Sequence, residues 1–191
     1  MDSVLAYKRD VINNKAINAV IGVGFFIIAT ALGAYVRIPL PGTPVPITLQ
    51  TFFVVLSGAV LGKKLGVLSQ AGYLFLGAAG IPIFQGYAFG TAHIFGPTGG
   101  YLIGFLLASF LTGKILEKEN ANIFKIIAAF VMGNIALYSL GVIWLMFIYR
   151  ISLINAITIG VLPFFAVEFI KVVTAAFIYR KISDRSKSIF S

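Results

Sequence analysis

Six long apolar segments divide this chain and constrain its fold more than any other feature. They cover approximately residues 17–36, 47–62, 66–81, 98–115, 123–147 and 155–179. A helix needs about 20 residues to cross a membrane, a length that the second and third segments do not quite reach. Charged residues make up 11% of the chain, whereas a soluble domain carries about 25%. The sequence therefore predicts an all-α integral membrane protein with a single domain, residues 1–191, built as a six-transmembrane-helix bundle.

The basic residues predict how this bundle is oriented. Twelve of the fifteen lysines and arginines lie before the first segment, after the last one, or in the connections after the second and fourth. The opposite side holds only Arg37 and Arg150, and Lys171 lies inside the sixth segment. Because Lys and Arg collect at cytoplasmic helix ends, both termini are predicted to be cytoplasmic. This distribution accounts for the net charge of +9, so no nucleic-acid partner is expected.

The connections on the sparsely charged side are the more elaborate ones. The stretch "RIPLPGTPVPI" after the first segment holds four of the seven prolines, which should make it extended and stiff. The connection "IPIFQGYAFGTAHIFGPTGGY" before the fourth segment is long and rich in glycine and aromatic residues. Because binding residues are often carried on elaborate loops, we expect recognition to occur on this side.

Glu168 and Lys171 are the most informative pair of residues, because both lie within an apolar segment. Three residues apart on a helix, they share one face. Arg180 lies about 18 Å further along the axis, which places the pair near mid-depth in the membrane. Each charge there costs roughly 2.5–3.5 kcal/mol, so the pair must face a neighbouring helix or a cavity. We interpret it as a polar ligand site; a structural salt bridge and a proton relay are the alternatives.

Other candidate residues are few. Gln50 and Tyr73 lie within apolar segments and are predicted either to bond to another helix or to line a cavity. His93 is the only histidine, and the chain has no cysteine, so no metal site is expected. Position alone leaves two interpretations of His93 open, a loop side chain and a donor to an anionic ligand. The stretch "GAVLGKK" lacks the spacing of a phosphate loop, so no ATPase is expected, and no nucleophile or paired carboxylate suggests an enzyme.

Several phrases of this sequence closely resemble one known family. They are "PGTPVPITLQTFFVVLSGAVLGKKLGVLSQAGYLFLGAAGIPIF", "FGPTGGYLIGF", "NIALYSLGVIWL" and the acid-x-x-Lys pair of the last segment. Together they are similar to the BioY family, the biotin-specific substrate-binding subunits, or S components, of energy-coupling factor (ECF) transporters. The resemblance implies a six-helix bundle in a prokaryotic cell membrane, with both termini inside and a biotin pocket near the external face. It also implies a transmembrane coupling protein and two ATP-binding cassette ATPase subunits as partners.

The resemblance also implies roles for individual residues. Glu168 and Lys171 occupy the places of the family's usual aspartate and lysine, and Val167 stands where a glycine often precedes the aspartate. The pair is expected to bind the ureido ring of biotin, with Gln50 and Tyr73 at the cavity. The loop before "GPTGGY" supplies Gln85, Tyr87 and His93 as further ligand-binding candidates; aromatic residues such as Tyr73, Tyr87 and Phe89 are expected to cover the rings. His93, Arg37 or the helix N-terminus at "GPTGGY" would meet the tail carboxylate.

Small residues on the first segment are the candidates for docking the coupling protein. In this family the first helix typically carries small-x-x-x-small contacts, and the matching pairs here are Ala29 with Gly33 and Thr30 with Ala34. No cofactor is expected, because biotin is the transported ligand. Two alternatives remain open: an S component for another vitamin, and a standalone proton-coupled carrier with Glu168 as its proton site.

Overall fold

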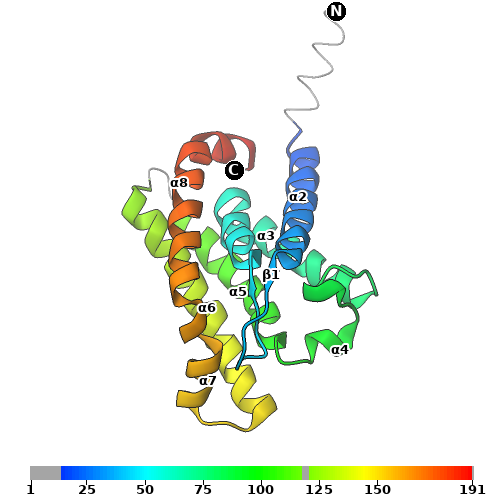
Figure 1. Cartoon of the computed structure of the whole chain (residues 1–191). Helices are drawn as coiled ribbons and strands as arrows, with labels where there is room; N and C mark the ends of the chain where they lie inside the picture. Colours follow the sequence, from blue (N-terminus) through cyan, green and yellow to red (C-terminus); the bar gives the residue numbers. More distant parts are fainter. Residues whose placement is uncertain (1–13, 118–120, 191) are drawn as a thin grey trace, which may run out of the picture.

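The computed structural model describes residues 14–117 and 121–190, and within them the protein is almost entirely helical (Figure 1). The predicted all-α architecture is therefore confirmed. The helices, in chain order, are α2 (Lys15–Tyr35), α3 (Gln50–Ala78), η1 (Gln85–Tyr87), α4 (Thr91–Ile94), α5 (Gly99–Leu116), α6 (Ile123–Tyr149), α7 (Leu153–Gly160), η2 (Leu162–Phe164) and α8 (Phe165–Phe190). A two-residue hairpin pairs β1 (Arg37–Ile38) with β2 (Ile47–Thr48).

Five continuous helical stretches in the described residues are long and apolar enough to cross a membrane. They are α2, α3, α5, α6 and the run from α7 through α8, Leu153–Phe190. Side chains such as Val20, Phe124 and Phe147 leave more than 70% of their surface exposed on the outside of the bundle. A water-soluble surface would not carry so many large apolar groups, whereas a bilayer solvates them.

The helix α3 folds back on itself at Gly62, where φ is 79° and ψ is 173°. Gln50 Nε2 donates a hydrogen bond to Tyr73 Oη at 2.9 Å, although 23 residues of straight helix would separate them by about 34 Å. Gln70 Nε2 likewise reaches Ser57 Oγ at 3.1 Å. The second and third apolar segments of the sequence are thus two antiparallel arms, residues 50–61 and 63–78, joined by a sharp turn.

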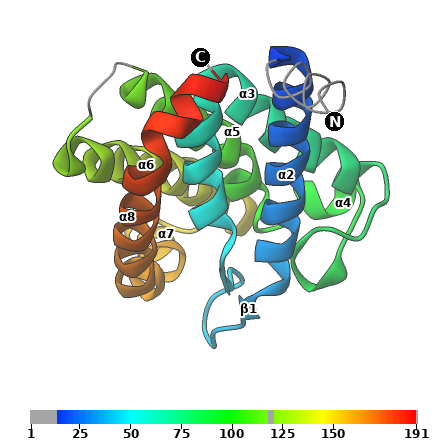
Figure 2. The same cartoon turned by 90° about the horizontal axis from the view of Figure 1, so that it is seen from above.

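The helix α5 lies between α3 and α6, and Figure 2 shows the first arm of α3 between α2 and α8, with α8 also packed on α6. Two apolar clusters fill the interior. One surrounds Tyr73, Phe84, Tyr101, Phe105 and Leu137. The other contains Val55, Leu116, Ile126, Phe130 and Tyr179. The polar residues described below lie where these helices converge.

The two ends of the bundle differ in character. At one end, Lys63 forms an ion pair with Glu117 at 2.8 Å, and Arg180 donates to the Ala121 carbonyl oxygen at 3.4 Å. The opposite end carries the β1–β2 hairpin, α4 and α7, away from the C-terminal end of α8 (Figure 1). The proline-rich stretch forms this hairpin, with Arg37 opposite Thr48 in the ladder. The basic connections and the elaborate connections therefore occupy separate ends.

Candidate functional site

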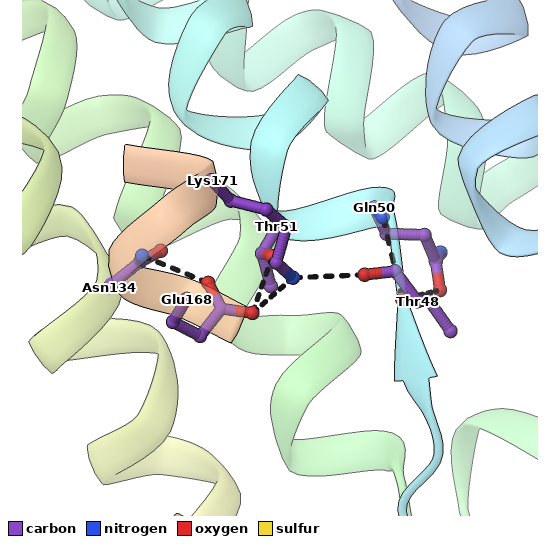
Figure 3. A network of polar contacts seen from close by, with 6 residues as sticks. All are labelled: Thr48, Gln50, Thr51, Asn134, Glu168 and Lys171. Carbon is purple, nitrogen blue, oxygen red and sulfur yellow. Dashed lines mark hydrogen bonds and ion pairs between the residues drawn. The ribbon is translucent and has the colours of Figure 1, made fainter. Parts of the chain in front are cut away.

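Glu168 and Lys171 form an ion pair on the first two turns of α8, with side chains only 12% and 8% exposed. Both side chains point toward α3, as Figure 3 shows. Glu168 lies in the first turn of α8 and bonds to a residue in the first turn of α3. Two helix N-termini, each with partial positive charge, thus stabilise its carboxylate.

Three neighbouring groups complete the coordination of this pair (Figure 3). Lys171 Nζ donates to the Thr48 carbonyl oxygen at 2.9 Å and to Thr51 Oγ1 at 2.6 Å. Thr51 Oγ1 donates to Glu168 Oε1 at 2.9 Å, and Asn134 Nδ2 donates to Glu168 Oε2 at 3.2 Å. The hydroxyl of Thr51 therefore accepts from the base and donates to the acid, linking the two charges.

A second layer of hydrogen bonds holds the start of α3 in place. Gln50 is 4% exposed, and its amide donates to the hydroxyl of Tyr73. Tyr73 is fully buried and donates in turn to the Ile83 carbonyl oxygen at 3.0 Å. Thr48 Oγ1 donates to Gln50 Oε1 at 3.3 Å. This chain of bonds ties β2, both arms of α3 and the loop before α4 into one unit.

A cavity of about 50 Å³ lies beside the ion pair. The β1–β2 hairpin, α3, α5, α6, η2 and α8 all contribute to its wall. The lining residues are Val45, Pro46, Ile47, Thr48, Gln50, Thr51, Gln85, Thr98, Tyr101, Leu102, Phe105, Leu137, Tyr138, Phe164 and Glu168. One side thus offers carboxylate, amide and hydroxyl groups, and the other offers aromatic and aliphatic surfaces. This combination suits a ligand with a polar head and an apolar body.

The predicted site residues occupy different positions relative to this cavity. Glu168, Gln50 and Gln85 line it, and Gln85 Nε2 donates to Thr98 Oγ1 at 3.2 Å. Lys171 lies directly behind Glu168, and Tyr73 lies behind Gln50. The structure therefore brings five of the predicted ligand-binding residues together at one place.

Tyr87 and His93 lie apart from the cavity lining. Tyr87 is 67% exposed, and its ring packs against Tyr35 with centroids 4.7 Å apart. His93 stacks on Phe84 at 5.1 Å, and its Nε2 is buried without a hydrogen-bond partner among the described residues. Burial and, secondarily, the charge of Arg37 lower the pKa of His93 below 6.5. Their roles as ligand contacts stay predictions.

The small residues of α2 face the interior of the protein. Thr30 and Ala34 are fully buried, and Ala29 is 5% exposed. Gly33 lies against the start of α3, where a Cβ atom would come within 3.1 Å of Gln50 N. All four predicted docking residues are thus buried in this conformation, and Thr30 and Gly33 make close contacts with α3.

The "GPTGGY" motif forms the junction where α5 approaches α6. A Cβ atom on Gly100 would overlap the side chain of Trp144, so only glycine fits there. Trp144 Nε1 donates to the Gly96 carbonyl oxygen at 2.9 Å. The motif thereby holds Thr98 at the cavity wall, where it bonds to Gln85. In this structure the motif therefore allows α5 and α6 to pack closely.

Several site residues were missed as ligand-site candidates at the level of sequence. Thr51 lies in "VPITLQT", but a threonine near a helix start carries no distinctive signal. Asn134 and Tyr138 were identifiable as polar residues four apart on one helix face. Tyr101 and Phe164 read as ordinary core aromatics. Among the described residues no three His, Asp or Glu side chains gather in a way that could hold a metal ion.

Comparison with known proteins places this geometry in context. Residues 8–188 match the model of the BioY family. The "Biotin transporter BioY" of Thermotoga maritima is 44% identical over 155 residues, covering 81% of this chain and 89% of that protein. The "Probable biotin transporter BioY" of Pyrococcus horikoshii is 41% identical over 164 residues, covering 86% and 95%. The crystal structure of "the S-component for biotin from an ECF-type ABC transporter" superposes with a TM-score of 0.84 at 30% identity, covering 90% of this chain and 94% of that one.

Proposed function

The chain belongs to the BioY family, and from this we propose that it is the biotin-binding membrane subunit, the S component, of an ECF importer. The relatives named above are a biotin transporter and a probable biotin transporter, and they match over most of their own length. The solved biotin S component shares the fold as well as 30% of the sequence. The site chemistry supports the same conclusion independently.

One observation carries the proposal, namely a buried acid–base pair at the edge of a cavity with aromatic walls. The ureido ring of biotin offers two N–H donors and one carbonyl acceptor. A carboxylate has about four acceptor positions. Thr51, Asn134 and Lys171 bind the carboxylate of Glu168 and the Tyr138 hydroxyl is also hydrogen-bonded to it, so a ligand N–H would take the place of one of these donors. Lys171 can donate to the ligand carbonyl by exchanging one of its present acceptors. Tyr101, Tyr138 and Phe164 would pack against the fused rings.

The cavity must widen before it can admit this ligand. Its volume of about 50 Å³ is well below the roughly 300–1,000 Å³ of typical ligand sites. The hairpin supplies Val45, Pro46, Ile47 and Thr48 to the wall, and its tip at Pro41 and Gly42 is exposed. We therefore propose that the hairpin swings outward to load biotin, with the tail carboxylate pointing toward the loops that carry Arg37 and His93.

The fold-back at Gly62 divides α3 into two arms, which supports six membrane spans in place of the five continuous helical stretches. Each arm of α3 would cross part of the bilayer in the opposite direction, which brings Lys63 and Lys64 to the end that also holds Glu117 and Arg180. With this count, both termini lie on the basic side, which we propose faces the cytoplasm of a prokaryotic cell. The cavity then opens toward the outside.

The sequence lacks the spacing of a phosphate loop, which is consistent with a subunit that other chains supply with energy. We propose that a transmembrane coupling protein and two ATP-binding cassette subunits supply it. The chain itself then performs binding, with no covalent step. The coupling protein would have to bind to an exposed surface, because the four small residues of α2 are buried in this conformation.

Isothermal titration calorimetry on the purified protein tests the proposal directly. Biotin is expected to bind the wild type tightly, and Glu168→Ala or Lys171→Ala is expected to abolish binding, because each leaves the other charge buried and unpaired. Glu117→Ala and Lys63→Ala are matched controls, since they remove an exposed ion pair at the opposite end. Near-wild-type affinity in both site variants would reject this site. A thermal-shift screen of vitamins would reveal a different ligand.

A further inference from the structure

The carboxylate of Glu168 receives about as many hydrogen bonds as such a group can accept. Lys171 Nζ and Thr51 Oγ1 donate to its Oε1, and Asn134 Nδ2 donates to its Oε2, as Figure 3 shows. The hydroxyl of Tyr138 is a fourth donor to the same group. Since a carboxylate has about four acceptor positions, side chains of the protein itself use all of them. A ligand N–H in the cavity can therefore bind this acid only by exchange with one of these donors.

Three of the four donors are poorly suited to this exchange. Displacing Lys171 from Glu168 would separate two buried opposite charges, which is strongly unfavourable. Thr51 Oγ1 accepts a hydrogen bond from Lys171 Nζ at 2.6 Å while it donates to Glu168, so its displacement would break two bonds to charged groups. Asn134 is 8% exposed and does not line the cavity, so its amide is not in the path of a ligand there. These three donors are therefore expected to stay in place.

Tyr138 lacks all three of these obstacles to exchange. Its side chain is neutral and lines the cavity. Among the described residues its hydroxyl is hydrogen-bonded to Glu168 alone. Its ring stacks on Phe164 with centroids 6.2 Å apart and meets Tyr101 edge-on at 5.8 Å, and neither contact depends on the hydroxyl. The hydroxyl can therefore give up its bond to the carboxylate at the cost of a single hydrogen bond.

We propose that Tyr138 is a positioning residue whose hydroxyl occupies, in this conformation, the acceptor position of Glu168 that a ligand N–H takes on binding. This inference rests on the proposed function, in which the N–H belongs to the ureido ring of biotin. A phenol O–H and a ureido N–H each supply one neutral donor, so the carboxylate stays fully hydrogen-bonded before and after the exchange. Tyr138 thus stabilises the buried acid before biotin arrives, and it competes with biotin for that acid.

Tyr138→Phe tests this inference in the full chain, because it removes the hydroxyl and keeps the ring. Calorimetry is expected to show biotin bound about threefold to tenfold more tightly than by the wild type, since no donor then has to leave Glu168. The thermal midpoint without biotin should fall, because the acid loses a donor, while the midpoint at one saturating biotin concentration should stay at the wild-type value. A merely structural role would lower both midpoints and leave the affinity unchanged, which would overturn the inference.

Tyr149→Phe is the matched control for this substitution. Tyr149 lies on the same helix, α6, is 45% exposed and does not line the cavity, so neither the affinity nor either midpoint should change. Weaker binding of biotin by Tyr138→Phe would mean that the hydroxyl contacts the ligand, and this outcome overturns the inference. An equal gain of affinity in Tyr149→Phe overturns it as well. Failure of the wild type to bind biotin would instead overturn the proposed function.

Discussion

Lys171 Nζ donates a hydrogen bond to the backbone carbonyl oxygen of Thr48 at 2.9 Å. Thr48 belongs to β2, the hairpin strand that lines the cavity, and pairs with Arg37 across the ladder. The charged site on α8 and the hairpin above it are therefore directly connected. A ligand carbonyl that accepts a hydrogen bond from Lys171 Nζ in place of the Thr48 carbonyl would weaken this connection. Occupancy of the cavity and the position of the hairpin are therefore expected to be coupled.

Thr51 is expected to be a binding determinant although its side chain is neutral. Thr51→Val removes the hydroxyl that accepts from Lys171 and donates to Glu168. We expect biotin affinity to fall by about tenfold to a hundredfold, because two hydrogen bonds to charged groups are lost. Thr51→Ser keeps the hydroxyl and should stay near wild type. Equal affinities of Thr51→Val and Thr51→Ser in calorimetry would contradict this role.

The ion pair should behave non-additively in stability. Lys171→Met or Glu168→Leu alone leaves one buried charge unpaired, at a cost of roughly 3–5 kcal/mol. The double variant removes both charges and should be much closer to wild type, although it would not bind biotin. Thermal unfolding midpoints of the four proteins in one detergent measure this. A double variant as unstable as the sum of the two single variants would show that the charges do not act as a pair.

Gly62 should tolerate no other residue, because its φ of 79° and ψ of 173° lie in a region essentially restricted to glycine. Gly62→Ala is expected to destabilise the fold by roughly 1–3 kcal/mol. Gly24→Ala is the matched control: Gly24 is helical, and a Cβ atom there would meet nothing within 4 Å. Its thermal midpoint should be unchanged or slightly higher. An equal effect of both substitutions would argue against strain at the turn.

His93 should make stability depend on pH. Burial and the charge of Arg37 hold its pKa below the ordinary value of 6.5. On acidification the unfolded chain binds the proton first, so stability is complete above pH 6.5 and falls as the pH drops below it. The thermal midpoint is expected to fall between pH 7 and about 5, and to fall less in His93→Gln. Parallel pH profiles of the two proteins would exclude His93 as the cause.

The proposed orientation can be tested with single cysteines, because the chain has none of its own. Lys64→Cys lies at the turn of α3 and Pro41→Cys lies in the hairpin loop, and both positions are exposed. A membrane-impermeant maleimide added to intact cells should label Pro41→Cys and leave Lys64→Cys unlabelled until the cells are lysed. The reverse pattern would show that the topology is inverted, and labelling of both positions from outside would contradict the six-span arrangement.

The sequence by itself determined the properties that depend on residues close together in the chain. Apolar runs predicted helices that a bilayer can solvate, clustered lysines and arginines predicted which helix ends share a side, and the three-residue spacing of Glu168 and Lys171 placed them on one face. Each of these inferences needs only helix geometry and the cost of burying charge. For that reason the fold class and the central pair of the site could be recognised without a structure.

Tertiary structure alone decided which distant groups complete the site. Thr51 and Asn134 meet Glu168 across 117 and 34 residues of chain, and the turn at Gly62 brings Gln50 to Tyr73. The burial of α2's small residues arises in the same way. No local spacing encodes such contacts, because they depend on how rigid helices pack against one another once all of them are in place.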